Sequence, residues 1–215
     1  MKSYFFPIGL LLLHLIACQS SPPKEATQEA FELGTITTGH YHNAYFGLDI
    51  YFDPTWNVQE EEQLELMEQA GEELLVGDNE TLKAALDAAT INTAYLLTIF
   101  KYPLGTRVDY NPNFVALVEN VSNFSDIETG ANYLFHVQQL LAQTALEYQF
   151  EEVYEQRVGT KIFHVLDLTA HHKGMDIQQS YWSTIEKGFC LSFILSYHSE
   201  QEKEELMAIV NQARM

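Results

Sequence analysis

The chain has 215 residues and a formal net charge of −19, which comes from 30 acidic and 11 basic residues. This charge argues against binding to nucleic acid or to anionic lipid heads, because both normally require clustered lysine and arginine. With 47% hydrophobic and 13% aromatic residues, the chain is nevertheless expected to fold and is not a disordered polyanion.

The first residues have the layout of an export signal, with Lys2 followed by an apolar run that starts at Tyr4. The run ends in a Leu-Ile-Ala-Cys stretch at 15–18, which resembles the cleavage site of bacterial lipoprotein signals. This resemblance implies cleavage between Ala17 and Cys18, with lipid attached to the Cys18 sulfur. Acyl chains would then hold the acidic protein at a membrane, because each CH2 group buried in the bilayer contributes about 0.8 kcal/mol of binding free energy.

Two other interpretations of this stretch fit less well. A transmembrane helix needs about 18 to 25 apolar residues, whereas this run is shorter and contains Pro7 and Gly9. An ordinary secretory signal prefers small residues in an A-x-A pattern, but Leu15 occupies the −3 position. Gln19 follows Cys18, and in a cell with two membranes the sorting rule for such a residue favours the outer membrane.

We therefore divide the chain into a signal peptide (1–17), a lipidated cysteine with a flexible tether (18–33) and a single domain (34–215). The tether begins with two serines and two prolines, which favour an extended, exposed segment. Loss of Lys2 with the signal would change the formal net charge from −19 to −20.

The first half of the domain is predicted to hold four strands and two helices. Apolar alternation between turn signals predicts strands at 35–42, 48–52, 93–102 and 114–121. Helical spacing of apolar residues, with glutamates on the other sides, predicts a helix over 59–76 that ends at Gly77. A short helix is expected at 81–89.

The second half is predicted to hold a long helix, a run of hairpins and a final helix. Ser125 and Glu128 have the spacing of a capping box, and an apolar stripe follows from Ile127 to Ala145. Four strands are expected at 151–158, 161–171, 175–186 and 189–197, joined by two-residue turns. Ser199 and Glu202 form a second capping box, which starts the last helix. The pattern predicts the α+β class, an antiparallel sheet covered by amphipathic helices.

The opening of the domain is similar to that of a known superfamily. Tyr41-x-Asn43, Phe46-Gly47-Leu48-x-Ile50 and Pro54-x-Trp56 resemble the start of PsbP/Mog-like domains, which include bacterial DcrB-type lipoproteins. The resemblance covers about residues 36–213. It implies an α-β-α sandwich that is used for binding and assembly without enzymatic activity, in roles from photosystem assembly to chaperoning. It supplies no catalytic residues to carry over, and the acidic segment at 59–80 departs from the family pattern.

No signature of an enzyme is found in the sequence. It has no G-x-S-x-G, H-E-x-x-H, G-x-x-x-x-G-K or G-x-G-x-x-G motif, and no calcium-binding D-x-[DN]-x-[DN]-G loop. With Cys18 lipidated, Cys190 has no intramolecular partner, and its apolar strand predicts a buried structural thiol. We therefore expect no catalysis and no cofactor.

Histidines are the weak candidates for a metal site. His40 and His42 lie two apart on a predicted strand, so both imidazoles should face the same side. His171 or His172 is a candidate third ligand, although adjacent strand residues point to opposite faces. Exposed strand histidines without a metal are the favoured interpretation, and metal or small-ligand binding at this face is the alternative.

Two features are candidates for a protein interface. Nine acidic residues at 60–80 would form a solvated helix face or a docking face for a basic partner. The loop at 101–110 carries Tyr102, Arg107 and Tyr110, which are residue types favoured in interfaces. The sequence thus predicts a lipid-anchored, non-catalytic binding, assembly or chaperone-like module of the bacterial cell envelope.

Overall fold

The computed structural model of the chain describes residues 31–76, 79–84 and 92–215. In these residues the strands form two antiparallel sheets, one of three strands and one of eight. The small sheet has the order β1-β2-β3, and the large sheet has the order β4-β5-β6-β11-β10-β9-β7, with β8 also paired to β9.

The bounds of the elements are as follows. The strands are β1 (Thr35–Thr37), β2 (His40–Asn43), β3 (Leu48–Tyr51), β4 (Asn57–Val58), β5 (Thr93–Phe100), β6 (Asn113–Asn120), β7 (Glu147–Phe150), β8 (Tyr154–Val158), β9 (Lys161–His172), β10 (Met175–Glu186) and β11 (Phe189–Tyr197). The helices are α1 (Glu61–Val76), α3 (Gly130–Leu141) and α4 (Glu200–Gln212).

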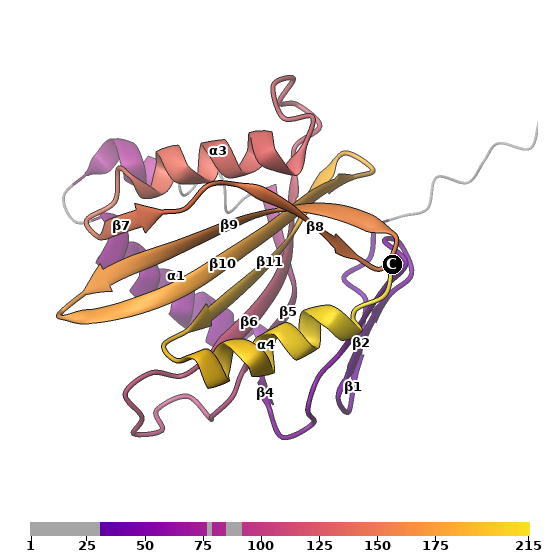
Figure 1. Cartoon of the computed structure of the whole chain (residues 1–215), viewed down its shortest axis with the longest axis horizontal. Coiled ribbons are helices and arrows are strands. Elements are labelled where there is room, and N and C mark those ends of the chain that lie inside the picture. The colour runs from indigo at the N-terminus through magenta and orange to yellow at the C-terminus, as the bar shows by residue number, and fades with distance from the viewer. Residues whose placement is uncertain (1–30, 77–78, 85–91) are drawn as a thin grey trace, which may run out of the picture.

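Both faces of the large sheet are covered. Neighbouring residues of β9 belong to different cores, with Val165 in one cluster and Leu166 in the other, because successive strand side chains point to opposite faces. Helix α4 and the small sheet pack on the first face, and α3 packs on the second (Figure 1). The α+β class with helices on an antiparallel sheet, predicted from the sequence, is confirmed.

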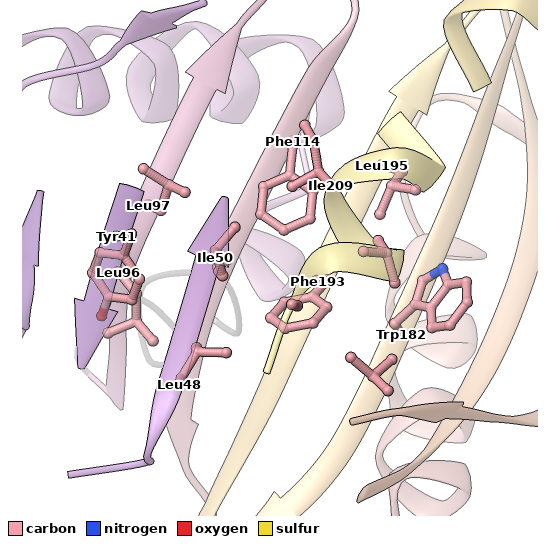
Figure 2. Packing of buried hydrophobic residues seen from close by; sticks show 14 of the residues in the cluster. Tyr41, Leu48, Ile50, Leu96, Leu97, Phe114, Trp182, Phe193, Leu195 and Ile209 are labelled. Carbon is pink, nitrogen blue, oxygen red and sulfur yellow. The ribbon is translucent and has the colours of Figure 1, made fainter. Parts of the chain in front are cut away.

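The larger core lies between the sheet, α4 and the small sheet (Figure 2). Phe193 is fully buried there, and its ring centroid lies 5.5 Å from that of Phe114 and 5.1 Å from that of Phe163. Such aromatic pairs contribute about 0.5–1.5 kcal/mol beyond the burial of their area. Tyr41 and Ile50 of the small sheet are also fully buried, so the sheet is part of this core.

The predicted hairpins of the meander are confirmed. Strands β9 and β10 meet at Lys173-Gly174, and β10 and β11 meet at Lys187-Gly188, with positive φ at all four residues. Two successive positive φ angles give a tight turn whose twist matches the strands it joins. The predicted bounds of β10 and β11 agree with the structure, and β9 is one residue longer than predicted.

The strand predicted at 35–42 is wrong in extent, because the structure divides it into the hairpin β1–β2. Gly39 has φ +70°, and a Cβ at this position would lie 2.8 Å from the carbonyl oxygen of Phe52. The Gly39 carbonyl accepts a hydrogen bond from Phe52 N at 3.0 Å. The chain therefore turns at Gly39, and β2 then pairs with β3 as predicted.

The capping box predicted at Ser125 and Glu128 is wrong, because α3 begins five residues after Ser125, at Gly130. Its N-cap is Thr129, whose hydroxyl accepts from Asn132 N at 3.2 Å while the Asn132 side chain accepts from Thr129 N at 3.0 Å. Gly130 lies directly on β10, where an added Cβ would be 2.0 Å from the Ser183 carbonyl oxygen. This close approach sets the start of the helix.

The end of α3 also differs from the prediction, which extended the apolar stripe to Ala145. The helix ends at Leu141, and β7 follows at Glu147–Phe150, before β8. Tyr148 and Phe150 stack with ring centroids 5.8 Å apart and pack against the second core. The single strand predicted at 151–158 is thus the shorter β8, and β7 is a strand that the sequence pattern does not predict.

The other predicted helices agree with the structure where it describes them. Helix α1 begins within two residues of the predicted start, and α4 carries the predicted Ser199–Glu202 capping box. Residues 80–84 are helical within the stretch predicted at 81–89, and the rest of that helix and the Gly77 cap lie outside the described residues.

The 15–18 stretch and most of the tether also lie outside the described residues, whereas the last tether residues contact the domain. Phe31 stacks on Phe189 with centroids 5.2 Å apart. The Leu33 carbonyl accepts from Tyr41 Oη at 2.8 Å. No helix in the described part of the chain is long and apolar enough to cross a membrane.

Candidate functional site

A groove of about 920 Å3 is the main cavity candidate, and it lies between the β3–β4 connection, the end of β5 and α4. Its lining residues come from three segments that are distant in the sequence. They are Tyr51, Phe52, Asp53, Pro54, Thr55, Trp56, Asn57, Lys101, Tyr102, Pro103, Glu205, Ala208, Ile209 and Gln212. Tyr102 is the member of the candidate partner loop that reaches this groove.

The turn before β4 positions Trp56. Trp56 N donates to the Asp53 carbonyl at 2.9 Å, and Asp53 Oδ1 accepts from Thr55 N and Thr55 Oγ1, both at 2.8 Å. The hydrogen bond from the Thr55 backbone is the main reason why the pKa of Asp53 is below its usual value. Trp56, part of the Pro54-x-Trp56 pattern, is 9% exposed within the first core. It also lines the groove.

An ion pair crosses one side of the groove. Lys101 Nζ lies 2.5 Å from Glu205 Oε2, which connects the end of β5 to α4. The hydrogen bond to Glu205 is the largest cause of the raised pKa of Lys101. Partial burial acts in the opposite direction and lowers this pKa by less. The Lys101 ammonium also lies 5.7 Å from the centroid of the Tyr102 ring. Because Lys101 and Glu205 are about a hundred positions apart in the chain, nothing in the sequence pattern indicates this ion pair.

The predicted His40/His42 face lies beside the groove and not within it. Both imidazoles hydrogen-bond the same atom, Asp49 Oδ1, at 2.8 Å from His40 Nε2 and 2.9 Å from His42 Nδ1. His40 also stacks on Tyr51, with ring centroids 4.5 Å apart and an interplanar angle of 5°. The two histidines therefore share a side, as predicted.

The structure gives the metal-binding alternative no added support. Residues 31–76, 79–84 and 92–215 contain no group of three or more His, Cys, Asp or Glu arranged to hold a metal ion. His171 does not join His40 and His42, because it lies near the far end of β9, where its Nδ1 is 2.7 Å from Asp176 Oδ1 (Figure 1).

The structure separates the three residues of the candidate partner loop. Asn111 holds the base of the loop, since its side chain bonds both Tyr102 N at 3.0 Å and Tyr102 O at 2.8 Å. Arg107 is exposed. Tyr110 is turned inward, and burial is the main cause of its raised pKa. Arg107 is thus the exposed candidate, Tyr102 is half-buried where it lines the groove, and Tyr110 is a packing residue.

Two other predicted features have clear positions. Four glutamates are exposed at the start of α1, which agrees with a solvated acidic face. They are Glu60, Glu61, Glu62 and Glu65.

Cys190 is fully buried, and its burial raises the pKa of the thiol to about 12. Its environment is that of a structural thiol, as predicted.

The chain matches no protein-family model, and no curated protein matches it. Among solved structures, cyanobacterial PsbP (CyanoP) from Synechocystis sp. PCC 6803 is 11% identical, with a TM-score of 0.48, and the match covers 85% of this chain and 95% of that chain.

Two further structures are similar at lower TM-scores. LpqN of Mycobacterium tuberculosis, described as involved in cell envelope biogenesis, is 14% identical over 57% of this chain and 78% of that chain, with a TM-score of 0.36. A protein of Bacteroides thetaiotaomicron VPI-5482 is 12% identical over 78% of this chain, with a TM-score of 0.39. This chain spans less than half of that protein, at 44%. Because all three TM-scores are below 0.5, we transfer no residue role from these proteins.

Proposed function

We propose that the protein is a lipid-anchored, non-catalytic binding or assembly module on the extracytoplasmic side of a bacterial membrane. Its groove would bind a protein partner that presents basic and apolar side chains. The observation that carries this proposal is the groove itself, which has a volume of about 920 Å3 and is lined by the aromatic rings of Tyr51, Phe52, Trp56 and Tyr102. Trp and Tyr side chains are the residues that most often dominate binding energy in protein interfaces.

The charges around the groove support a basic partner. Two lining residues, Asp53 and Glu205, carry carboxylates, and the lining cation Lys101 is already paired with Glu205. Helix α4 places further glutamates, such as Glu200 and Glu202, in its first turn. With a chain charge of −19, approach of a basic surface is favoured over long range, and complementary charge raises association rates.

The proposed anchor defines where this binding takes place. The sequence at Cys18 supports acylation, and the tether at 18–33 would connect the lipid to the domain. Confining both partners to one membrane surface raises their effective concentration, so a weak groove interaction is sufficient for assembly.

The test is photo-crosslinking in cells that express the full-length protein. A benzophenone amino acid at Tyr102 should capture one specific protein, whereas the same probe at Phe135, which is 57% exposed on α3, should not. Exposed Gln212 lines the groove, so Gln212→Lys should reduce the Tyr102 product at least about threefold and Gln212→Glu should preserve it.

The anchor is tested in the same cells. Cys18→Ser should leave a precursor that is neither cleaved nor acylated, and the crosslink at Tyr102 should decline with it. Normal processing and acyl labelling of this variant would show that the lipoprotein assignment is wrong. Identical products from the Tyr102 and Phe135 probes, or equal products from the two Gln212 variants, would exclude the groove as the basic-partner site.

A further inference from the structure

A cluster of aromatic rings with a lysine lies at the end of the large sheet where the tether joins the domain. Phe31 stacks on Phe189, with ring centroids 5.2 Å apart, and meets the edge of Tyr45 at 5.8 Å. The Lys187 ammonium lies 4.6 Å from the centroid of the Tyr45 ring and donates to the Tyr45 carbonyl at 2.6 Å. We call Phe31, Tyr45, Lys187 and Phe189 the tether-end face.

The tether-end face is accessible to solvent, unlike the core beneath it. Phe31 is 37% exposed, Lys187 is exposed, and Tyr45 and Phe189 are half-buried. Phe46, which is 6% exposed, lies beneath them with its ring centroid 5.8 Å from that of Phe189. Aromatic rings beside a cation suit the headgroup level of a bilayer, where amphipathic rings are enriched and lysine side chains reach the interface.

The neighbouring connection, between β6 and α3, adds another exposed ring at this end of the sheet (Figure 1). The carbonyl of Gly188, in the β10–β11 turn, accepts from Val121 N at 3.0 Å, and Phe124 N donates to the Val121 carbonyl at 2.9 Å. Phe124 is 46% exposed. The apolar surface at this end therefore extends beyond the tether-end face itself.

The tether-end face and the groove lie at opposite ends of the same strands. On β6, Asn120 pairs with Phe189, whereas Asn113 pairs with Phe100, the residue before Lys101 of the groove. This length of β6 corresponds to about 24 Å at about 3.4 Å per residue. Figure 1 likewise shows the β10–β11 turn at one end of the sheet and β4 at the other.

Lipid attachment would bring the tether-end face, and not the groove, to the membrane. This step rests on the anchor at Cys18 in the proposed function. The chain from Cys18 to Phe31 can span at most about 45 Å, so Phe31 stays within that distance of the lipid. Such confinement gives a high effective concentration of bilayer surface at this face, so even a weak contact is populated.

Charge selects the class of lipid. The formal net charge of −19 opposes approach to anionic headgroups, and Glu32, beside Phe31, is exposed. Zwitterionic headgroups carry no net charge to repel the protein, and their phosphate oxygens accept hydrogen bonds from an ammonium such as that of Lys187. A zwitterionic bilayer therefore fits the tether-end face better than an anionic one.

We propose that the tether-end face rests on the headgroup region of a zwitterionic bilayer. The rings of Phe31 and Tyr45 enter the interface, Lys187 lies at the level of the phosphates, and the strands of the large sheet stand away from the membrane. The groove is then held about 24 Å farther from the lipid, where a partner can enter it.

Quenching by a spin-labelled lipid measures this contact. Full-length protein is purified from bacterial membranes, checked by mass spectrometry for the acyl chain on Cys18, and reconstituted into phosphatidylcholine vesicles that contain a lipid with a nitroxide on its acyl chain. A cysteine introduced at exposed Ser122 carries the fluorophore NBD, because Cys18 is blocked by lipid and Cys190 is buried. Ser122 Cβ lies 3.5 Å from the position of a Cβ on Gly188, in the turn that follows Lys187.

The same fluorophore at Leu104, which is 46% exposed in the loop after β5, is the matched control. Quenching at Ser122 should exceed quenching at Leu104 at least about fivefold, because nitroxides quench only at short range and the loop end of β5 lies about 24 Å farther from the lipid. Replacing part of the phosphatidylcholine with anionic phosphatidylglycerol should reduce quenching at Ser122.

Substitution of Phe31 tests the contribution of its ring. Phe31→Ser should lower quenching at Ser122 at least about threefold, whereas Phe31→Trp should retain it, since tryptophan favours the membrane interface. Leu104→Ser removes an exposed apolar side chain at the other end of the sheet and should leave quenching at Ser122 unchanged.

Three results in protein that carries the acyl chain would overturn the contact and leave the anchor intact. They are equal quenching at Ser122 and Leu104, absence of quenching at both positions, and quenching at Ser122 that Phe31→Ser does not change. A blue shift of the Ser122 fluorophore without quenching would also overturn the contact and would show that protein, such as a second copy of the chain, covers the face. Absence of an acyl chain on Cys18 would instead overturn the anchor, and this proposal with it.

Discussion

Asp49, on β3, connects β2 and the C-terminal residues of the chain. Its carboxylate accepts hydrogen bonds from His40 and His42, and its backbone pairs with Arg214 through bonds of 3.0 and 2.9 Å. Burial raises the pKa of Asp49, but the hydrogen bonds and the attraction of the two imidazoles together lower the pKa below its usual value. A lowered pKa in the folded state means that the ionised carboxylate stabilises the fold.

The first prediction concerns the dependence of stability on pH. The contribution of Asp49 is complete above the unfolded-state pKa of about 3.9 and is lost as the pH falls through the lower folded-state value. Asp49→Asn should therefore lower the free energy of unfolding by about 1 kcal/mol at pH 7. The difference from the natural protein should shrink below about pH 4. Urea unfolding at a series of pH values measures both effects.

Asp176→Asn is the matched control for this prediction. Asp176 also accepts a hydrogen bond from a histidine, but its side chain is 65% exposed and the pair lies at a hairpin end. Its replacement should change the free energy of unfolding by less than about 0.5 kcal/mol. Equal losses for the two variants, or an Asp49→Asn effect that persists at pH 2, would contradict the assigned role of Asp49.

At the level of the elements, α3 docks on the large sheet through a glycine, Gly130, as well as through the buried Leu134. A Cβ at Gly130 would lie 2.0 Å from Ser183 O and 2.7 Å from Ser183 C, both of which are backbone atoms of β10. Because a backbone contact cannot be relieved by rotation of a side chain, Gly130→Ala must shift the helix. We expect a loss of about 3 kcal/mol in the free energy of unfolding, measured by urea denaturation.

Gly71→Ala provides the matched control. Gly71 is helical in α1, and a Cβ there would meet nothing within 4 Å. Alanine is favoured over glycine in a helix by about 1 kcal/mol, so this change should stabilise the protein. If both variants lose stability to a similar degree, the loss at Gly130 does not report on α3 docking.

The elements also show what the sequence made predictable. Strands β10 and β11 were placed correctly because long apolar alternation and Lys-Gly turns determine a hairpin locally. The start of α3 was misplaced because the local Ser125–Glu128 pattern competes with a tertiary contact, the approach of Gly130 to Ser183. Strand β7 was missed because its pairing with β9 gives no local signal.

The candidate sites were less predictable than the fold. The sequence indicated Tyr102 through its residue type, but the groove depends on the meeting of Trp56, Lys101 and Glu205 from separate segments. Gln59 and Thr98 likewise become neighbours only through the pairing of β4 with β5. A single sequence contains no pattern that brings these residues together.

At the scale of the whole molecule, the layers packed on both faces of the large sheet keep solvent away from the centre of that sheet. Cys190 lies on β11 in this centre, is fully buried, and contacts Ser192 Oγ at 3.5 Å. Burial is the main cause of the rise in its pKa from the ordinary 9.0 to about 12. The thiolate is the reactive form, so at pH 8 this change alone reduces the reactive fraction about a thousandfold.

Labelling of Cys190 should therefore report opening of the whole domain. In the Cys18→Ser chain Cys190 is the single thiol, and its reaction with iodoacetamide at pH 8 should be at least about a thousandfold slower in buffer than in 8 M urea. A cysteine introduced at exposed Ser125 should instead react in buffer within about tenfold of its rate in urea. Mass spectrometry of timed samples gives both rates.

Gly130→Ala should accelerate labelling of Cys190 but not of the introduced cysteine, since the substitution raises the population of open molecules and leaves the exposed site unchanged. Rapid labelling of Cys190 in the folded natural sequence would show that one face of the sheet opens without global unfolding.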